Sequence, residues 1–186
     1  WGSRLSVDGD VRLENNAWIF PYSDTDNGGS PYLICRNLEV ETGCGFNGDG
    51  EGFGFGRGPG GAPNPGTTTG SGGGYGGKGG RASSGAAFGV PYGSAVFPID
   101  PGSGGAQTTS ARGGNGGSVI RVEALERILI NGVLTVCGTA GGSFNARNAG
   151  GGAGGSIFLK ASVIAGTNGI LRADGGDSPF DSSTWG

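Results

Sequence analysis

Hydrophobic and polar residues alternate along the first part of the chain. Between residues 3 and 20, the apolar side chains that share one face of this alternation are Leu5, Val7, Val11 and Leu13. A period of two is typical of a β-strand with one buried face. Residues 32–40 form a second run rich in strand-forming side chains. Both segments are therefore predicted to contain β-strands.

A different pattern occupies residues 43–117, where glycine sets the period. Glycine recurs at every third residue from 70 to 79, and glycine doublets with the same spacing return near residues 113 and 151. Three residues per turn is the period of the polyproline II helix, in which only glycine fits on a crowded face. We therefore predict polyglycine II strands that pack side by side. Their packing positions would be Gly70, Gly73, Gly76, Gly79, Gly113, Gly116, Gly151 and Gly154.

The last third of the chain contains an internal repeat. Residues 116–124 match 154–161 at an offset of 38, and residues 131–138 match 168–175 at an offset of 37. Each unit contains glycine doublets, a strand, a turn and a second strand. Repeats of this size that cannot bury an apolar face alone normally stack into a solenoid. The predicted fold is all-β with little or no α-helix: a parallel β-solenoid with long polyglycine II insertions.

Length and composition indicate one domain over residues 1–186. Its expected parts are N-terminal strands (1–42), a glycine-rich polyglycine II block (43–117) and C-terminal solenoid repeats (118–186). The 47 glycines would indicate disorder if they had no period. Because they are periodic and the apolar residues are clustered, we expect a folded chain.

The repeat resembles a known class of protein. Gly-Gly-x-Gly-Gly-Ser, a strand and then Asn-Gly-(Ile/Val)-Leu resemble repeats in large glycine-rich extracellular surface proteins of microbes, over about residues 113–176. The glycine period is similar to that of receptor-binding adhesins at some phage tail-fibre tips and of a springtail antifreeze protein. This resemblance implies an extracellular or secreted protein. The chain begins at Trp1 and has no methionine, which indicates a processed product or a piece of a longer chain.

Charge and residue content argue against several function classes. The formal net charge of −3 provides no basic field for nucleic acid. No apolar run approaches the roughly 18 residues of a membrane-spanning helix. The chain has no histidine, no Gly-x-Ser-x-Gly elbow and no phosphate-binding Gly-x-x-x-x-Gly-Lys loop. We therefore expect neither an enzyme, nor a nucleic-acid-binding protein, nor a membrane-spanning one.

Two local features suggest a metal site and a disulfide. Asp24 and Asp26 lie in a segment like the start of an EF-hand loop, so calcium is the one cofactor considered; an Asx-rich turn is the alternative. The odd number of cysteines suggests one disulfide and one free thiol in a secreted chain. Cys35 and Cys44 flank one strand, which favours their pairing, and three reduced, buried cysteines are the alternative.

Two function hypotheses follow. In the first, the protein is a structural subunit of an extracellular filament, appendage or surface layer. It would form a homopolymer head to tail, because solenoid ends need a cap or a neighbour and residues 3–13 contain no lysine or proline to blunt a strand edge. The residues expected at these assembly ends are Leu5, Val7, Val11, Leu13 and Trp185.

The second hypothesis is a receptor- or glycan-binding adhesin domain. Exposed aromatic side chains would then contact cell-surface glycans or a receptor. The candidates for this contact are Tyr75, Phe88 and Tyr92.

Overall fold

The computed structural model describes residues 2–64, 68–82 and 87–179. These residues form β-strands and no helix, in agreement with the predicted all-β class. The strands are β1 (Arg4–Ser6), β2 (Val11–Leu13), β3 (Trp18–Ile19), β4 (Tyr32–Val40), β5 (Gly45–Asn47), β6 (Val119–Ile130), β7 (Val133–Thr135), β8 (Ser143–Phe144), β9 (Arg147–Asn148), β10 (Ser156–Lys160), β11 (Val163–Ala165) and β12 (Ile170–Arg172).

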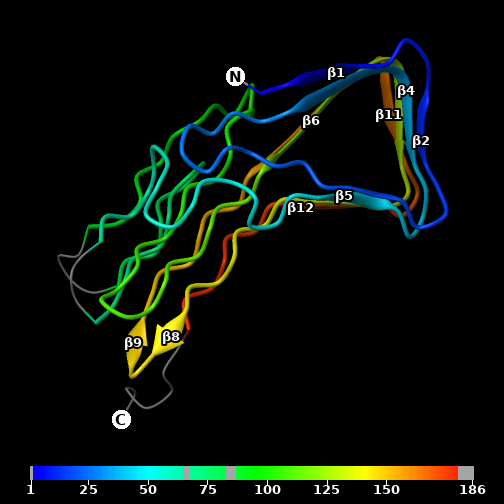
Figure 1. Ribbon diagram of the computed structural model, residues 1–186. Helices are drawn as coiled ribbons and strands as arrows, with labels where there is room; N and C mark the ends of the chain where they lie inside the picture. Colours follow the sequence, from blue (N-terminus) through cyan, green and yellow to red (C-terminus); the bar gives the residue numbers. More distant parts are fainter. Residues whose placement is uncertain (1, 65–67, 83–86, 180–186) are drawn as a thin grey trace.

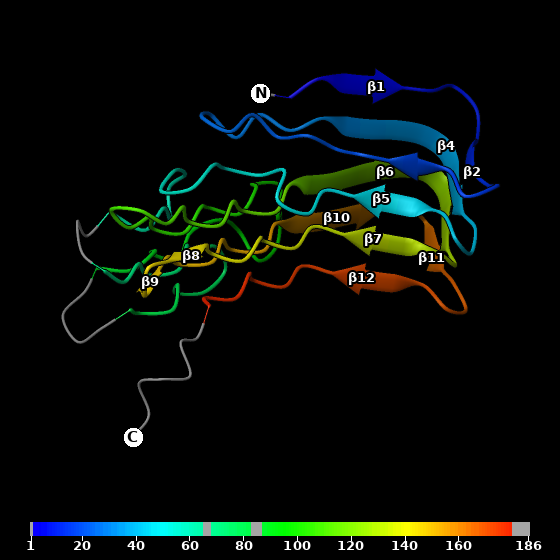
Figure 2. The same cartoon turned by 60° about the horizontal axis from the view of Figure 1, so that its bottom comes forward.

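Successive passes of the chain lie side by side in two parallel sheets. The larger sheet has the order β1–β4–β6–β10, with β2 paired to β4 and β11 paired to β6. The second sheet has the order β12–β7–β5–β3. The strands follow chain order across both sheets, and Figure 2 shows them as parallel layers. Only the short hairpin β8–β9 is antiparallel among the described strand pairs.

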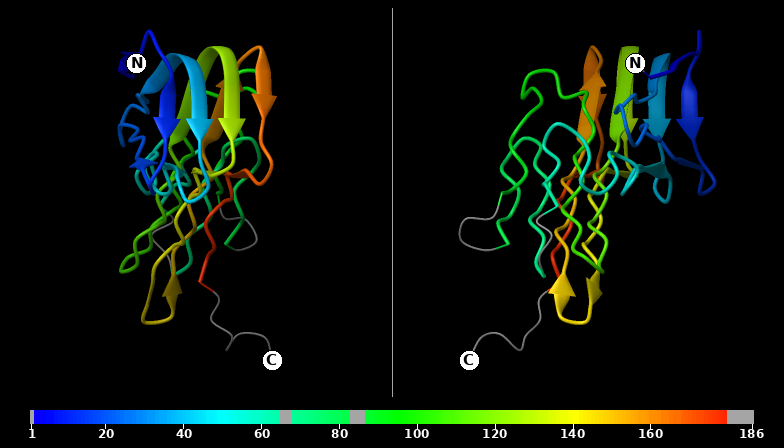
Figure 3. Two further views of the ribbon diagram at one scale, coloured as in Figure 1. Left: turned by 90° about the vertical axis from the view of Figure 1, so that its right-hand side faces the viewer. Right: turned by 60° about the vertical axis from the view of Figure 1, so that its left-hand side comes forward.

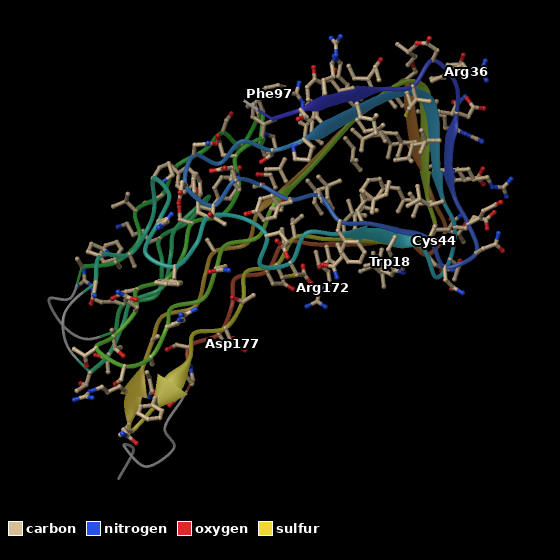
Figure 4. All side chains as sticks on the ribbon, viewed as in Figure 1. Trp18, Arg36, Cys44, Phe97, Arg172 and Asp177 are labelled. Atoms are coloured by element: carbon tan, nitrogen blue, oxygen red, sulfur yellow. The ribbon has the colours of Figure 1, made fainter. Side chains whose placement is uncertain are left out.

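The larger sheet turns a corner within its longest strands. The first halves of β4 and β6 pair with β1 and β10, and their second halves pair with β2 and β11. A register shift between Cys35 and Asn37 marks this corner, where Arg36 points outward (Figure 4). The second sheet then returns below, so that each pass of the chain has three sides (Figure 1).

The parallel register places side chains in columns through the core. One column is Leu5, Leu33, Val122 and Leu159; a second is Val11, Leu38, Ile128 and Ile164; a third is Ile19, Phe46, Leu134 and Leu171. The two middle members of each column are buried in one hydrophobic cluster. Apolar burial of this kind is the main favourable term in folding. The core therefore lies between the two sheets.

The register also corrects the alignment of the repeat. β10 pairs with β6 so that Ser156 is opposite Val119, and β12 pairs with β7 so that Ile170 is opposite Val133. Both offsets are 37, so the offset of 38 at the serine was wrong by one residue. A slip of one residue would turn the apolar face of a strand outward. Burial of that face therefore sets the register, although the repeated glycine-serine motifs are then one residue out of alignment.

Between passes, the chain leaves the strands on one side. Residues 48–118 lie between β5 and β6, residues 136–155 lie between β7 and β10, and residues 173–179 follow β12. Outside 65–67 and 83–86, these segments extend together from the open side of the sheets in Figure 1. Their backbone groups bond to several neighbours at once. Segment 148–155 exchanges backbone hydrogen bonds with 70–73, 103–106, 114–117, 136–142 and 176.

Close backbone approach explains why these segments contain glycine. A Cβ on Gly152 would lie 2.0 Å from the carbonyl oxygen of Asn115, and one on Gly116 would lie 1.8 Å from that of Gly102. No glycine within 70–79, 113–117 or 150–155 has a positive φ. Packing, rather than a left-handed backbone, therefore demands glycine at most positions in these segments.

Candidate functional site

The stack of strands ends in an unpaired edge on each side. β1, β2 and β3 pair only with β4 and β5, whereas β10, β11 and β12 pair only with β6 and β7. Figure 3 shows this layered arrangement, from the N-terminal strands at one edge to the C-terminal strands at the other. Within the described parts of the chain, the outer sides of these six strands have no strand partner. Unpaired edges of this kind are templates for another strand.

Core-facing side chains are exposed at these two edges. Inside the stack, Leu33 is 7% exposed, and the other middle members of the three core columns are less exposed still. At one end Leu5 is 61% and Ile19 is 38% exposed; at the other, Ile164 is 52% and Leu171 is 51% exposed. These side chains occupy the same columns as the buried ones but have a neighbouring strand on one side only.

Further apolar side chains enlarge both exposed surfaces. Trp18, Val163 and Ile170 are exposed on the outer faces of β3, β11 and β12, and Phe20 is exposed directly after β3. A cleft of about 130 Å³ with mostly apolar walls lies at the β1–β3 end, between Leu5 and the β3 region. Contiguous apolar patches of this sort mark interaction surfaces on soluble proteins.

Charged residues at the two ends are partly paired within the chain. At the β1–β3 end, Arg36 donates a hydrogen bond of 2.8 Å to Asp10, which lowers the pKa of that carboxyl, with a second contribution from Asn37. At the β10–β12 end, Lys160 lies 3.5 Å from Glu123 and Arg172 lies 2.9 Å from Asp174. These charges flank the apolar columns and leave the columns themselves uncovered.

Four of the five predicted assembly residues lie at the β1–β3 end. Leu5 is exposed, Val7 and Val11 are partly buried against the core, and Leu13 is buried. Trp185 lies outside the described residues. The opposite edge is built by β10–β12, which sequence reasoning did not select. The internal repeat carried that signal, because residues 156–172 belong to its second copy and no described strand pairs with their outer side.

Seven of the eight predicted packing glycines meet backbone at the Cβ position. The nearest atoms would be between 1.8 and 2.4 Å away for Gly70, Gly73, Gly79, Gly113, Gly116, Gly151 and Gly154. Gly76 is different, since a Cβ there would meet nothing within 4 Å, and its assignment as a packing position is wrong. It lies in an exposed bend in which Tyr75 donates a backbone hydrogen bond to Gly77. The glycine period continues through this bend, but no neighbouring atom lies against the Cβ position of Gly76.

The carboxylates proposed for calcium have other partners. Asp24 accepts hydrogen bonds from the backbone N–H groups of Asp26 and Asn27, at 3.0 and 2.9 Å, which is the geometry of an Asx turn. Asp26 forms an ion pair with Arg57. Among the described residues, no three histidine, cysteine, aspartate or glutamate side chains gather as metal ligands would. The structure therefore places a turn where the sequence suggested a metal site.

The predicted disulfide between Cys35 and Cys44 is wrong, because all three cysteines are free thiols. Cys35 lies on β4 in the larger sheet, whereas Cys44 precedes β5 in the second sheet (Figure 4). Both belong to the buried hydrophobic cluster, and burial raises the pKa of the Cys35 thiol. They act as small apolar side chains, which matches the reduced alternative. Cys137 is half-buried beside Thr135.

The aromatic residues suggested for adhesion make internal contacts. The rings of Tyr75 and Tyr92 pack edge to face at 5.0 Å. The Tyr92 hydroxyl donates to the carbonyl of Pro101 and accepts from Ser103, and burial raises the pKa of Tyr92. Phe88 lies under two cations, with the guanidinium of Arg81 at 4.7 Å and the ammonium of Lys78 at 5.7 Å. These contacts hold the glycine-rich segments together.

Among the described residues, no helix has the length and apolar character needed to cross a bilayer. Comparison with protein-family models, curated proteins and solved structures finds no match to this chain.

Proposed function

We propose that this protein is a structural subunit that assembles head to tail into a filament or layer. One observation carries the proposal: three core columns run through the stack and end on both sides in apolar side chains that are exposed (Leu5, Ile19, Ile164 and Leu171) or only partly buried (Val11 and Leu159). Leaving these side chains in water is unfavourable by roughly 25 cal/mol for each Å² of apolar surface. A second copy of the chain would bury them, as the inner strands bury their equivalents.

The two ends differ, and this difference determines how the assembly grows. All strands of the main stack run parallel, so a copy added in the same orientation would extend both sheets in parallel. It would join its β1–β3 edge to the β10–β12 edge of the previous copy. A contact between two different surfaces does not close on itself, and an open filament results unless the rotation between copies forms a ring.

We further propose that the passes constitute a parallel β-solenoid and that the connecting segments are polyglycine II strands. Stacked passes with a constant offset of 37 residues in the last two layers support the solenoid. The three-residue glycine period and backbone bonding to several neighbours support polyglycine II. Such an array would make each subunit a rigid element, as a structural role requires.

An extracellular location and a place in an appendage or surface layer stay predictions. They rest on the resemblance of the repeat to microbial surface proteins. The adhesin hypothesis has less support, because Tyr75, Phe88 and Tyr92 are engaged within the chain. We therefore favour the structural role and propose the chain itself as the main partner.

Two blocking variants test head-to-tail assembly. Ile19→Lys places a charge on the β1–β3 end, and Leu171→Lys places one on the β10–β12 end of the same column. Each variant alone should remain monomeric in analytical ultracentrifugation, because its one intact end finds no intact copy of the complementary end. An equal mixture should form dimers through the two intact ends.

The matched control is Leu125→Lys, at a leucine that is 72% exposed on the corner side of β6 and away from both edges. It should assemble like the unchanged chain, and all three variants should retain the circular dichroism of a folded chain. Loss of assembly in Leu125→Lys, or an unchanged chain that is monomeric at every concentration, would contradict the proposal. Dimers of a single blocking variant would indicate a symmetric contact between identical ends.

A further inference from the structure

We propose that the junction between subunits has one fixed register, in which β1, β2 and β3 of one copy continue the side-chain columns of β10, β11 and β12 of the copy before it. This inference rests on the head-to-tail assembly proposed above. It specifies which residues meet at the junction. In the core, Leu5 would lie beside Leu159 of the preceding subunit, Val11 beside Ile164, and Ile19 beside Leu171.

The register follows from the columns inside one chain. Leu33 and Val122 are neighbours between Leu5 and Leu159, and every member of this column is apolar. The other two core columns are likewise apolar from end to end. Because side chains alternate between the two faces of a strand, a slip of one residue at the junction would set polar side chains against the core. Only an even slip would preserve the apolar face.

An outward-facing column distinguishes the fixed register from an even slip. Its members are Arg4, Tyr32, Arg121 and Phe158, which alternate between arginine and an aromatic ring. Within the chain, the guanidinium of Arg121 lies 4.3 Å from the Tyr32 ring and 5.9 Å from the Phe158 ring. Attraction between a cation and an aromatic face explains this order.

The same alternation would continue across the junction. In the fixed register, Arg4 of one subunit lies beside Phe158 of the subunit before it, so that each arginine in the column has an aromatic neighbour. A slip of two residues would place Arg4 beside Lys160 instead, and two cations would then face each other. The Arg–aromatic column therefore selects the fixed register over that slip.

Charges at the two ends also favour this partner. Counted with their connecting turns, residues 156–172, which contain β10–β12, carry Lys160 and Arg172 and no acidic residue. The opposite end, residues 4–19, carries more acidic than basic side chains and so has the opposite sign. Complementary charges guide two surfaces into one orientation and disfavour contact between two identical ends.

Disulfide trapping tests the register. In the fixed register, Ser6 lies beside Lys160 of the preceding subunit, and both are exposed. Neighbouring strands are about 4.8 Å apart, which suits a disulfide, whereas a diagonal neighbour two residues away is about 7–8 Å distant. The double variant Ser6→Cys/Lys160→Cys, in a Cys137→Ser background, should give a ladder of covalent oligomers on mild oxidation. The matched control Arg4→Cys/Lys160→Cys should cross-link at least about tenfold more slowly.

The outcomes separate the register from the assembly itself. Filaments in which the control pair cross-links as fast as the Ser6 pair, or faster, would overturn the register and leave head-to-tail assembly standing. A chain that stays monomeric and gives no ladder with either pair would overturn both. As a second measurement, Arg4→Ala should raise the critical concentration for assembly about twofold to fivefold, the effect expected from one exposed cation–π contact. An unchanged critical concentration would argue against the Arg4–Phe158 contact.

Discussion

Two glycines of the same run should respond in opposite ways to alanine. A Cβ on Gly73 would lie 2.3 Å from the carbonyl oxygen of Ser103 and 2.8 Å from that of Gly104. A Cβ on Gly76, three residues later, would meet nothing within 4 Å. The substitution is chemically identical at both positions, so that the difference between them measures packing alone.

The size of the effect at Gly73 can be worked out from the contacts. The backbone around Ser103 must move by about 0.7 Å merely to bring the closest contact to 3.0 Å, and overpacking of this kind typically destabilises by about 1–3 kcal/mol. The movement also disturbs the 3.0 Å hydrogen bond from the Gly73 N–H to the carbonyl of Gly151, which contributes about 1 kcal/mol. We expect Gly73→Ala to lower the free energy of unfolding by about 2–4 kcal/mol.

At Gly76 the balance is reversed. Neither a close contact nor a positive φ opposes a methyl group there. Alanine restricts the unfolded chain, which at a compatible position stabilises by about 0.4–1 kcal/mol. Gly76→Ala should therefore be neutral or slightly stabilising.

Urea unfolding followed by tryptophan fluorescence and circular dichroism would compare the two variants with the unchanged chain. At this chain length, the loss at Gly73 corresponds to a fall in Tm of about 5–15 °C. Equal small changes for both variants would show that the glycine segments are not closely packed. A larger loss of unfolding free energy in Gly76→Ala than in Gly73→Ala would show that Gly76, and not Gly73, is closely packed.

Two other predictions concern charge and thiols. Arg121 donates a 2.6 Å hydrogen bond to Glu123 and holds the pKa of that carboxyl below its ordinary 4.5. The ionised Glu123 therefore stabilises the fold above pH 4.5, and this stabilisation is lost as the pH falls through the lower pKa of the folded state. Glu123→Gln should lose less stability than the unchanged chain between about pH 6 and about pH 3 in urea unfolding; a steeper loss would contradict the assignment. Because Cys44 is buried, Cys44→Ser should lower the free energy of unfolding by about 1–3 kcal/mol. Because its thiol is free, a reductant should leave the Tm of the unchanged chain as it is, and a lower Tm in reductant would reveal a disulfide.

The sequence was informative wherever local periodicity and tertiary packing agree. The run 32–40 is the strand β4 with its predicted bounds, because alternating burial there follows the apolar pattern. The segment 3–20 instead forms three short strands, because the chain turns a corner after β1 and again before β3. The position of a corner depends on packing against the neighbouring pass of the chain, so the local hydrophobic pattern does not predict it.

The glycine pattern predicted close packing but not its limits. Gly73 and Gly79 are closely packed, while Gly76 between them lies in open space, although all three share one period. Which glycines meet a neighbour depends on where segments far apart in sequence come together, such as 70–73 beside 148–151. Similarly, Cys35 and Cys44 are close in sequence, but Cys35 lies within β4 of the larger sheet and Cys44 lies just before β5 of the second sheet, and both are free thiols.

The axial rise of the assembled filament tests the central claim most directly. Each subunit contributes four layers of strands, and neighbouring strands in a sheet lie about 4.8 Å apart, so head-to-tail stacking requires a rise of about 19 Å per subunit. Cryo-electron microscopy of the assembled chain would give this value by helical reconstruction, together with a continuous 4.8 Å strand spacing across the junction. A rise near 19 Å with unbroken sheets is the predicted result. A rise near twice that value, which would indicate paired identical ends, or a break in the sheets at each junction, would contradict the proposed assembly.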